Sequence, residues 1–283
     1  MRSGSDARSV RAMESRTKGI GRQSLIIASA TFMLIAAAVG AGAFGGASVN
    51  DLQDGALSAQ GSYLAPAGPA FSIWSLIYLG LIAYTVWQAL PAQRQDPRQQ
   101  AVGGWIAASM VLNGLWLVTA QFLTLWLTVV VIALLLAVLA RVIVVLGRFP
   151  ARNLADRILT DGANGLHFGW VTIATVANTA AWLTQIAPES WAQVADAWAI
   201  AVLAVVLVIG AAAAWATGRI APALATAWGL AWLAVGRLTG EPESTPTAIA
   251  AIVVAVLLVA TGVVSALRGT RAVRSSSETE TAR

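Results

Sequence analysis

Residues 124–147 read TLWLTVVVIALLLAVLARVIVVLG, an apolar run interrupted only by Arg141. A helix needs about 20 apolar residues to cross the hydrocarbon core of a bilayer, so this run predicts a membrane-spanning helix. Arg141 lies near the end of the run. We expect its guanidinium to reach the lipid headgroups rather than to serve a function inside the membrane.

Seven further runs of comparable length and apolarity surround this one. They are residues 25–48, 70–90, 102–122, 163–186, 195–217, 220–238 and 247–267. The whole chain is 58% hydrophobic and only 11% charged, whereas soluble domains carry about 25% charged residues. The sequence therefore predicts an all-α polytopic membrane protein with eight spans, and it excludes an ordinary soluble domain.

The basic residues are unevenly distributed among the connections between these runs. Those on one side of the predicted bundle, after a basic N-terminal tail, are Arg94, Arg98, Arg148, Arg152, Arg157, Arg219, Arg268, Arg271 and Arg274. The alternate connections carry mainly acidic residues, and only Arg237 lies near that side. By the positive-inside rule, this distribution predicts a multi-pass protein of the cell membrane with both termini in the cytoplasm.

The segments outside the apolar runs are polar. The tails, residues 1–22 and 269–283, are rich in Ser, Arg, Thr and Glu, a composition typical of disorder. We expect residues 148–162 to form a short amphipathic helix on the inner membrane surface. Residues 1–43 also resemble a secretory signal that ends in a small-residue cleavage site. The uncharged run that contains 25–48 is too long for an ordinary signal, so we favour a span.

Several function classes lack their signatures. The chain has no cysteine, which excludes disulfides and thiolate sites, and it contains no glycine-rich phosphate loop, HExxH or GxSxG pattern. The net charge of +5 comes with no basic face interleaved with aromatic residues, so we expect no nucleic-acid partner. The spans contain no paired carboxylates, which argues against an ion-driven transporter but leaves passive flux of an apolar solute open.

Twelve tryptophans and one histidine remain as candidates for function. Several lie at helical spacing with other aromatic, small or polar residues, and these stripes are Phe71, Trp74 and Tyr78; Trp105, Ser109 and Trp116 with Asn113 on the flank; and His167, Trp170, Ala174 and Asn178. An unpaired amide or imidazole is costly in lipid, so these stripes should face the bundle interior. They either line a pocket for a flat apolar ligand or pack helix against helix, and spacing alone favours packing.

Four short motifs within these stripes resemble those of one family. They are FSIWSLIY at 71–78, AYTVWQ at 83–88, LNGLW at 112–116 and WVTIATVAN at 170–178. Taken in this order, they make residues 25–186 similar to the TspO family of translocator and tryptophan-rich sensory proteins. The resemblance implies a five-helix transmembrane bundle with a pocket for porphyrins and other hydrophobic ligands, often as a homodimer. Residues 195–267 have no counterpart in that five-helix pattern and are expected to form a three-helix extension.

The resemblance also implies which residues line or frame the pocket. They are Trp74, Tyr78, Asn113, Trp116, Trp170 and Asn178. His167 stands where the family tends to have tyrosine, and it is either an axial ligand of haem iron or a neutral histidine bonded to a neighbouring helix. We expect no resident cofactor and no metal, with a porphyrin or haem as a candidate ligand.

The first loop departs from the family. It offers Pro66 and Pro69 but no tryptophan, only Tyr63, which argues against tryptophan-assisted porphyrin breakdown and against an enzyme. The leading hypothesis is a TspO-like membrane protein that binds a tetrapyrrole or another hydrophobic ligand in a sensory or regulatory role. The alternative is a transporter of small hydrophobic molecules.

Overall fold

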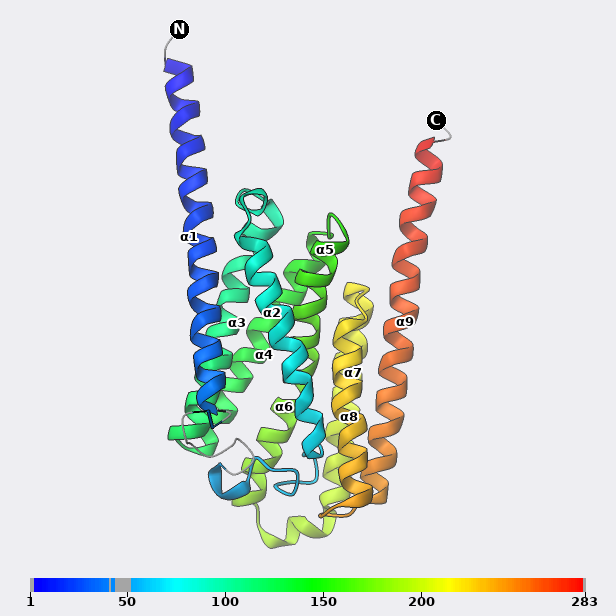
Figure 1. The fold of residues 1–283 in the computed structure, drawn as a ribbon. Coiled ribbons are helices and arrows are strands. Elements are labelled where there is room, and N and C mark those ends of the chain that lie inside the picture. Colours follow the sequence, from blue (N-terminus) through cyan, green and yellow to red (C-terminus); the bar gives the residue numbers. More distant parts are fainter. Residues whose placement is uncertain (1–2, 41, 44–51, 282–283) are drawn as a thin grey trace.

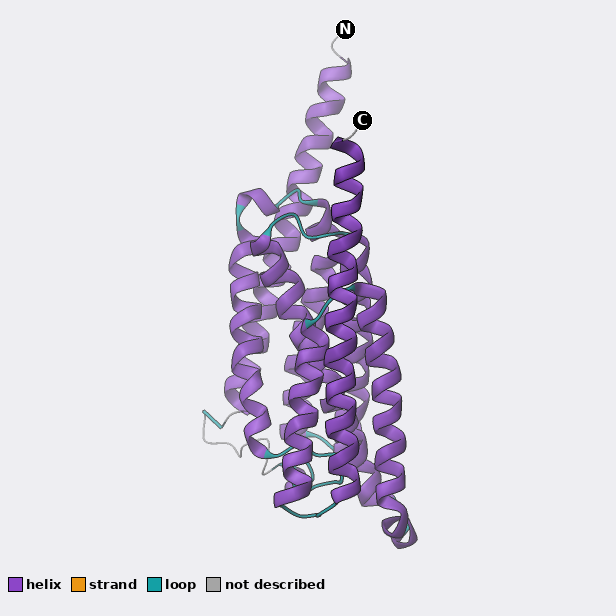
Figure 2. Ribbon diagram, turned by 90° about the vertical axis from the view of Figure 1, so that its right-hand side faces the viewer, coloured by secondary structure: helices purple, strands orange, loops and turns teal. Residues whose placement is uncertain are grey.

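The computed structural model describes residues 3–40, 42–43 and 52–281, and within these ranges it contains helices and loops but no strand (Figure 2). Eight of the helices are long: α1 (Ser3–Gly40), α2 (Ile73–Ala89), α3 (Pro97–Phe122), α4 (Leu125–Arg148), α6 (Ala163–Ile186), α7 (Ala195–Thr217), α8 (Ala221–Thr239) and α9 (Thr245–Thr281). Each overlaps one predicted span, in order. The all-α polytopic fold predicted from the sequence is confirmed.

Shorter elements join the long helices. They are the 3-10 helices η2 (Gln53–Gly55), η3 (Gly68–Ser72), η4 (Pro91–Gln93) and η6 (Glu189–Val194), the single turn α5 (Leu154–Asp156) and the π-helix η5 (Arg157–Gly162). The predicted span 25–48 is helical only to Gly40, and the rest of it falls largely on residues 41 and 44–51, outside the described part of the chain. These include part of the small-residue motif that resembles a cleavage site.

The long helices run up and down side by side (Figure 1). The Ser3 end of α1 and the Thr281 end of α9 extend from the same end of the bundle, as an even number of spans requires. We call this the terminal end. The segment 52–72 lies at the opposite end, which we call the loop end. That the terminal end faces the cytoplasm stays a prediction from the charge distribution.

Six long helices are apolar enough to cross a membrane, judged on the described residues: α1, α2, α3, α4, α7 and α9. The other two, α6 and α8, pack against each other, α6 also against α4 and α2, and α8 also against α9. A Cβ atom on Gly169 of α6 would lie 2.2 Å from the Pro222 carbonyl oxygen of α8. Because α6 and α8 pack closely among other helices, polar groups at their contacts face protein rather than lipid. Such helices can carry polar side chains that would be costly in contact with lipid.

Two expectations about polar segments need correction. The tails predicted to be disordered are helical where the structure describes them, because α1 begins at Ser3 and α9 continues to Thr281. Neither tail contains a proline, and a helix that has already nucleated extends easily into adjoining residues. Residues 148–162 do not form a separate surface helix, since α5 and η5 lead directly into α6.

A buried group of charged side chains closes the terminal end, and we call it the ion cluster. Arg98 at the start of α3 donates to both Asp156 and Asp161, and Arg219 pairs with Asp161 at 3.1 Å. Beside the cluster, Arg152 pairs with Asp96, which caps α3. Burying Asp156 and Asp161 is tolerable only with cations in contact, which explains why the segment 154–162 turns into the bundle.

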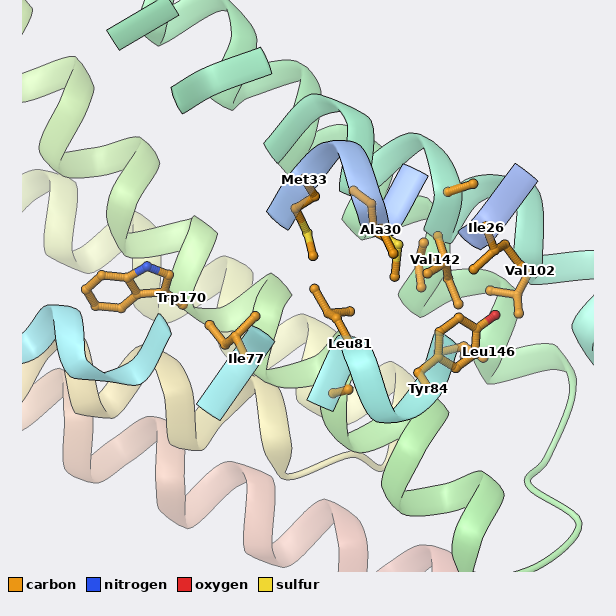
Figure 3. Packing of buried hydrophobic residues seen from close by; sticks show 14 of the residues in the cluster. Ile26, Ala30, Met33, Ile77, Leu81, Tyr84, Val102, Val142, Leu146 and Trp170 are labelled. Atoms are coloured by element: carbon orange, nitrogen blue, oxygen red, sulfur yellow. The ribbon is translucent and has the colours of Figure 1, made fainter. Parts of the chain in front are cut away.

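Apolar packing fills the interior between the two ends. Figure 3 shows Ile77, Leu81 and Tyr84 of α2 on the side that faces Met33 of α1, with Trp170 of α6 at the far side of the same cluster. Side chains of this cluster come from α1, η3, α2, α3, α4, α6 and α8. Because lipid is as apolar as these side chains, close packing rather than escape from water holds the helices together.

Candidate ligand-binding site

A cavity lies between α2, α3, α4 and α6, towards the loop end of the bundle. Its helical walls consist of Phe71, Trp74, Asn113, Trp116, Ile132, Leu135, Trp170, Val171, Ala174, Ala177 and Asn178, with Phe71 supplied by η3. Its cover consists of Ala56, Leu57, Ser58, Ala65 and Pro66 from the segment 52–72. The enclosed space is about 40 Å³, which is room for a few water molecules and far below the range of small-molecule sites. A ligand therefore has to displace the cover or the rings of the wall to bind here.

Aromatic rings form one wall of the cavity and fix each other in place. The Trp74 and Trp170 rings meet edge to face with centroids 6.1 Å apart, and Phe71 meets Trp170 in the same way at 5.7 Å. Tyr78 stacks on Trp74 at 5.3 Å with the two planes 19° apart. Tyr78 therefore supports the wall from behind rather than lining the cavity.

The two predicted asparagines line the cavity and also tie its walls together. The Trp116 indole donates to Asn178 Oδ1 at 3.1 Å, which links α3 to α6. The Tyr78 hydroxyl donates to Asn113 Oδ1 at 3.2 Å, which links α2 to α3. The Asn178 amide nitrogen is engaged as well, since it donates to the Ala174 carbonyl. Hydrogen bonds within the protein thus already occupy both amide oxygens and the Asn178 amide nitrogen.

His167 does not occupy the place that the sequence predicted for it. Its side chain is 0% exposed, and neither ring nitrogen has a hydrogen-bond partner among the described residues. The predicted bond to a neighbouring helix is absent among the described residues. The imidazole instead lies edge to face with the Trp74 ring, with centroids 6.0 Å apart. His167 lies behind the Trp74 wall and does not line the cavity, so nothing in this arrangement favours an axial haem ligand.

Five of the seven predicted site residues therefore line one cavity: Trp74, Asn113, Trp116, Trp170 and Asn178. The sequence of the chain matches the family model described as TSPO-like protein over residues 24–264. The chain belongs to the TSPO-like protein family. Comparisons with curated proteins and with solved structures found no match.

The family match changes the predicted extent of the resemblance. It does not stop at residue 186 but continues through α7 and α8 and into α9. The three helices expected to be an extension without counterpart are thus largely covered by the TSPO-like family model. The chain is a multi-pass membrane protein of this type, and the contacts of α8 bear directly on its cavity.

The cover of this TSPO-like cavity is fastened to α8, a connection that the sequence analysis missed. The Trp228 indole donates to the Ala70 carbonyl at 2.9 Å, and the Ala67 amide donates to the Trp232 carbonyl at 3.0 Å. The first loop contains no tryptophan, but two tryptophans from α8 lie against it. Trp228 and Trp232 are four residues apart, which indicates that they share one face of the helix. The spacing does not indicate which segment that face contacts.

Arg237 of α8 is the third attachment between this TSPO-like protein's cover and the bundle. Its side chain is 1% exposed, and it donates to the Ala59 carbonyl at 2.9 Å and the Pro242 carbonyl at 2.7 Å. These contacts explain why one arginine departs from the positive-inside pattern. The guanidinium is held inside the protein, where its position depends on these carbonyls rather than on the membrane surface.

Among the described residues, no group of three or more histidine, aspartate and glutamate side chains could hold a metal ion. The cavity itself offers indole faces, aliphatic walls and two engaged amides. A ligand in this cavity would meet ring faces and aliphatic side chains rather than free amide oxygens.

Proposed function

We propose that this TSPO-like membrane protein binds a flat hydrophobic ligand, with tetrapyrroles as the leading class, in the cavity covered by the segment 52–72. The observation that carries the proposal is the enclosed aromatic wall of Trp74, Phe71 and Trp170. Indole faces favour flat conjugated molecules, because stacking adds to the gain from removing apolar surface from water. A sensory or regulatory role follows if the occupied cavity favours one of two arrangements of the bundle.

The two asparagine side chains in the cavity are held in place before any ligand binds, which supports the proposal. Asn113 and Asn178 do not have to be ordered by the ligand, since their partners on α2 and α3 already hold them. Amides that are held before binding lose less entropy when the ligand arrives, even though the cover or the rings must move to admit it. Because few unpaired polar groups line the walls, we expect affinity for several flat apolar molecules.

Transport of small hydrophobic molecules is the alternative, and the ion cluster argues against it. A solute crossing from the cavity to the terminal end would have to separate Arg98 from Asp156 and Asp161, all three of which are buried. Breaking a buried ion pair is costly. We therefore favour binding over passage, in a protein of the cell membrane with both termini in the cytoplasm and with a homodimer as its expected assembly.

The proposal is tested by titrating the purified protein in detergent with protoporphyrin IX and following the Soret band. Wild type should bind saturably, and Trp170→Ala and Asn178→Ala should each weaken binding by about tenfold, the effect of losing roughly 1.4 kcal/mol of contact. Trp105→Ala is the matched control, because Trp105 lies on α3 like Trp116 but is 40% exposed on the outer face. Its affinity should equal that of wild type.

Two outcomes count against the proposed function. If wild type shows no saturable binding, the aromatic wall serves packing only. If all three variants bind like wild type while remaining folded by circular dichroism, the ligand binds elsewhere. Flux of the same porphyrin across liposomes containing the protein would then test the transport alternative.

A further inference from the structure

The cover of the cavity is held in place mainly by residues distant in sequence. At its beginning, the Gln53 side-chain amide donates to the Ala120 and Leu123 carbonyls at the end of α3, both at 2.9 Å. Beyond Gln53, three hydrogen bonds between described residues join the cover to α8. The segment that closes the ligand site therefore depends on a helix more than 150 residues further along the chain.

We infer that α8 holds the segment 52–72 closed over the cavity, which makes Arg237 and Trp228 positioning residues of the ligand site. This inference rests on the proposed function. It assigns a role to α8: the helix itself does not line the cavity, but it fixes the segment that does. A ligand enters or leaves when this segment separates from α8.

Arg237 is the strongest of these attachments because its charge is buried. Each hydrogen bond to a buried charged group counts strongly towards stability, and the Arg237 Nε has no partner among the described residues. The guanidinium donates to carbonyls of the cover and of the α8–α9 turn, and the Arg237 carbonyl accepts from the Ser244 amide at 2.9 Å. If the cover leaves, the guanidinium loses one of its acceptors, so Arg237 favours the closed state.

The cover and α8 are also packed closely together, in addition to being joined by hydrogen bonds. A Cβ atom on Gly236 would lie 3.4 Å from the Ala67 amide nitrogen and 3.6 Å from the Ala67 Cβ. Gly236 thus lets the cover lie directly on α8, next to the bond from Ala67 to the Trp232 carbonyl. The same closeness permits a direct test.

A disulfide can lock the cover to α8. The pair Ala67→Cys and Gly236→Cys would have its Cβ atoms 3.6 Å apart, within the range of about 3.5–4.5 Å found in disulfides. The chain has no cysteine of its own, so no other pairing competes. The control pair is Gly40→Cys with Leu117→Cys, whose Cβ atoms would also lie 3.6 Å apart and which would link α1 to α3 instead.

The measurement is the rate of protoporphyrin IX association and dissociation for each pair, oxidised and then reduced with dithiothreitol. The oxidised cover pair should exchange ligand at least about tenfold more slowly than its reduced form, and the control pair should show no difference. Equal rates in the oxidised and reduced cover pair would overturn the inference while leaving the proposed function intact. Absence of binding in wild type would overturn both.

A single substitution tests the same role of α8 without a cross-link. Arg237→Gln should speed ligand dissociation by about tenfold, the change that losing one or two hydrogen bonds produces. Arg141→Gln is its control, since Arg141 is another arginine within a helix of the bundle but contacts Trp105 rather than the cover. Equal dissociation rates for Arg237→Gln, Arg141→Gln and wild type would contradict the role given to α8.

Discussion

The two ends of the bundle are closed by two buried arginines whose hydrogen bonds go to different kinds of acceptor. Arg98 at the terminal end is 3% exposed and contacts the carboxylates of Asp156 and Asp161. Arg237 at the loop end is 1% exposed and contacts only backbone carbonyls, with no ion pair to any described residue. Carboxylates neutralise the arginine at the terminal end, whereas backbone carbonyl dipoles stabilise the charge of the arginine at the loop end.

This difference indicates which end can open. Separating Arg98 from two carboxylates would leave opposite charges unpaired inside the protein, a penalty of several kcal/mol. Separating Arg237 from one carbonyl loses a hydrogen bond to a charged group, worth about 1.5–3 kcal/mol. The terminal end is therefore the more costly one to open, and the loop end is better suited to reversible movement.

The largest effect is expected from removing the cation at the terminal end. Arg98→Leu leaves Asp156 without its cation, so we expect a loss of about 3–5 kcal/mol in stability. The measurement is the apparent midpoint of thermal unfolding in detergent, with Arg141→Leu as the control. A midpoint equal to that of wild type would mean that the ion cluster does not hold the terminal end together.

A smaller effect is expected from the corresponding change at the loop end. Arg237→Leu leaves acceptors without a donor but no charge without a counterion, so we expect a loss of about 1–3 kcal/mol. Hydrogen exchange of the amides in the segment 52–72 should become faster, while exchange near Arg98 stays unchanged. A loss as large as that of Arg98→Leu would remove the distinction between the two ends.

The smallest effect concerns the contact between α6 and α8 that connects the two ends. The Thr226 hydroxyl lies 3.1 Å from the Gly169 carbonyl of α6 and 3.0 Å from the Pro222 carbonyl of its own helix. Thr226→Val should lower stability by about 0.6 kcal/mol, the average for such bonds between membrane helices.

Thr239→Val is the matched control for this third change. The Thr239 hydroxyl bonds only within its own helix, to the Val235 carbonyl, and is exposed. We expect no measurable change in its unfolding midpoint. If both threonine variants have the same unfolding midpoint, the contact between α6 and α8 depends on close packing alone. The Thr226 hydrogen bond then adds nothing to it.

The fold was predictable because the membrane restricts which secondary structures can span it. A segment of apolar residues in lipid must satisfy its backbone hydrogen bonds internally, so the run at 124–147 and its seven neighbours could only be helices in a protein of this composition. The tails were not predictable from composition, because whether a polar helix continues beyond a stable one depends on the helix it joins.

The site was predictable in part, for a geometric reason. Helical spacing identifies which residues share a face, and this placed Trp74, Trp116 and Trp170 in one cavity. Spacing does not give the rotation and depth of neighbouring helices, which decide that Tyr78 and His167 stand behind Trp74 rather than beside the cavity.

The cover and the ion cluster depended on contacts that the sequence does not reveal. The segment 52–72 has no regular pattern, and α8 sets its position through Trp228 and Arg237. Asp156 and Asp161 lie just outside the predicted spans, so they did not count as intramembrane acids. The π-helix before α6 brings them to Arg98.

The polarity of α6 and α8 also has a consequence for how the protein is made. The translocon admits each segment to the bilayer largely according to that segment's own hydrophobicity, and these two helices fall short of the other six. Each is synthesised directly after a more apolar helix that it touches in the finished bundle, α4 for α6 and α7 for α8. The order of synthesis therefore presents α6 and α8 to the membrane directly after a more apolar helix that each can pack against.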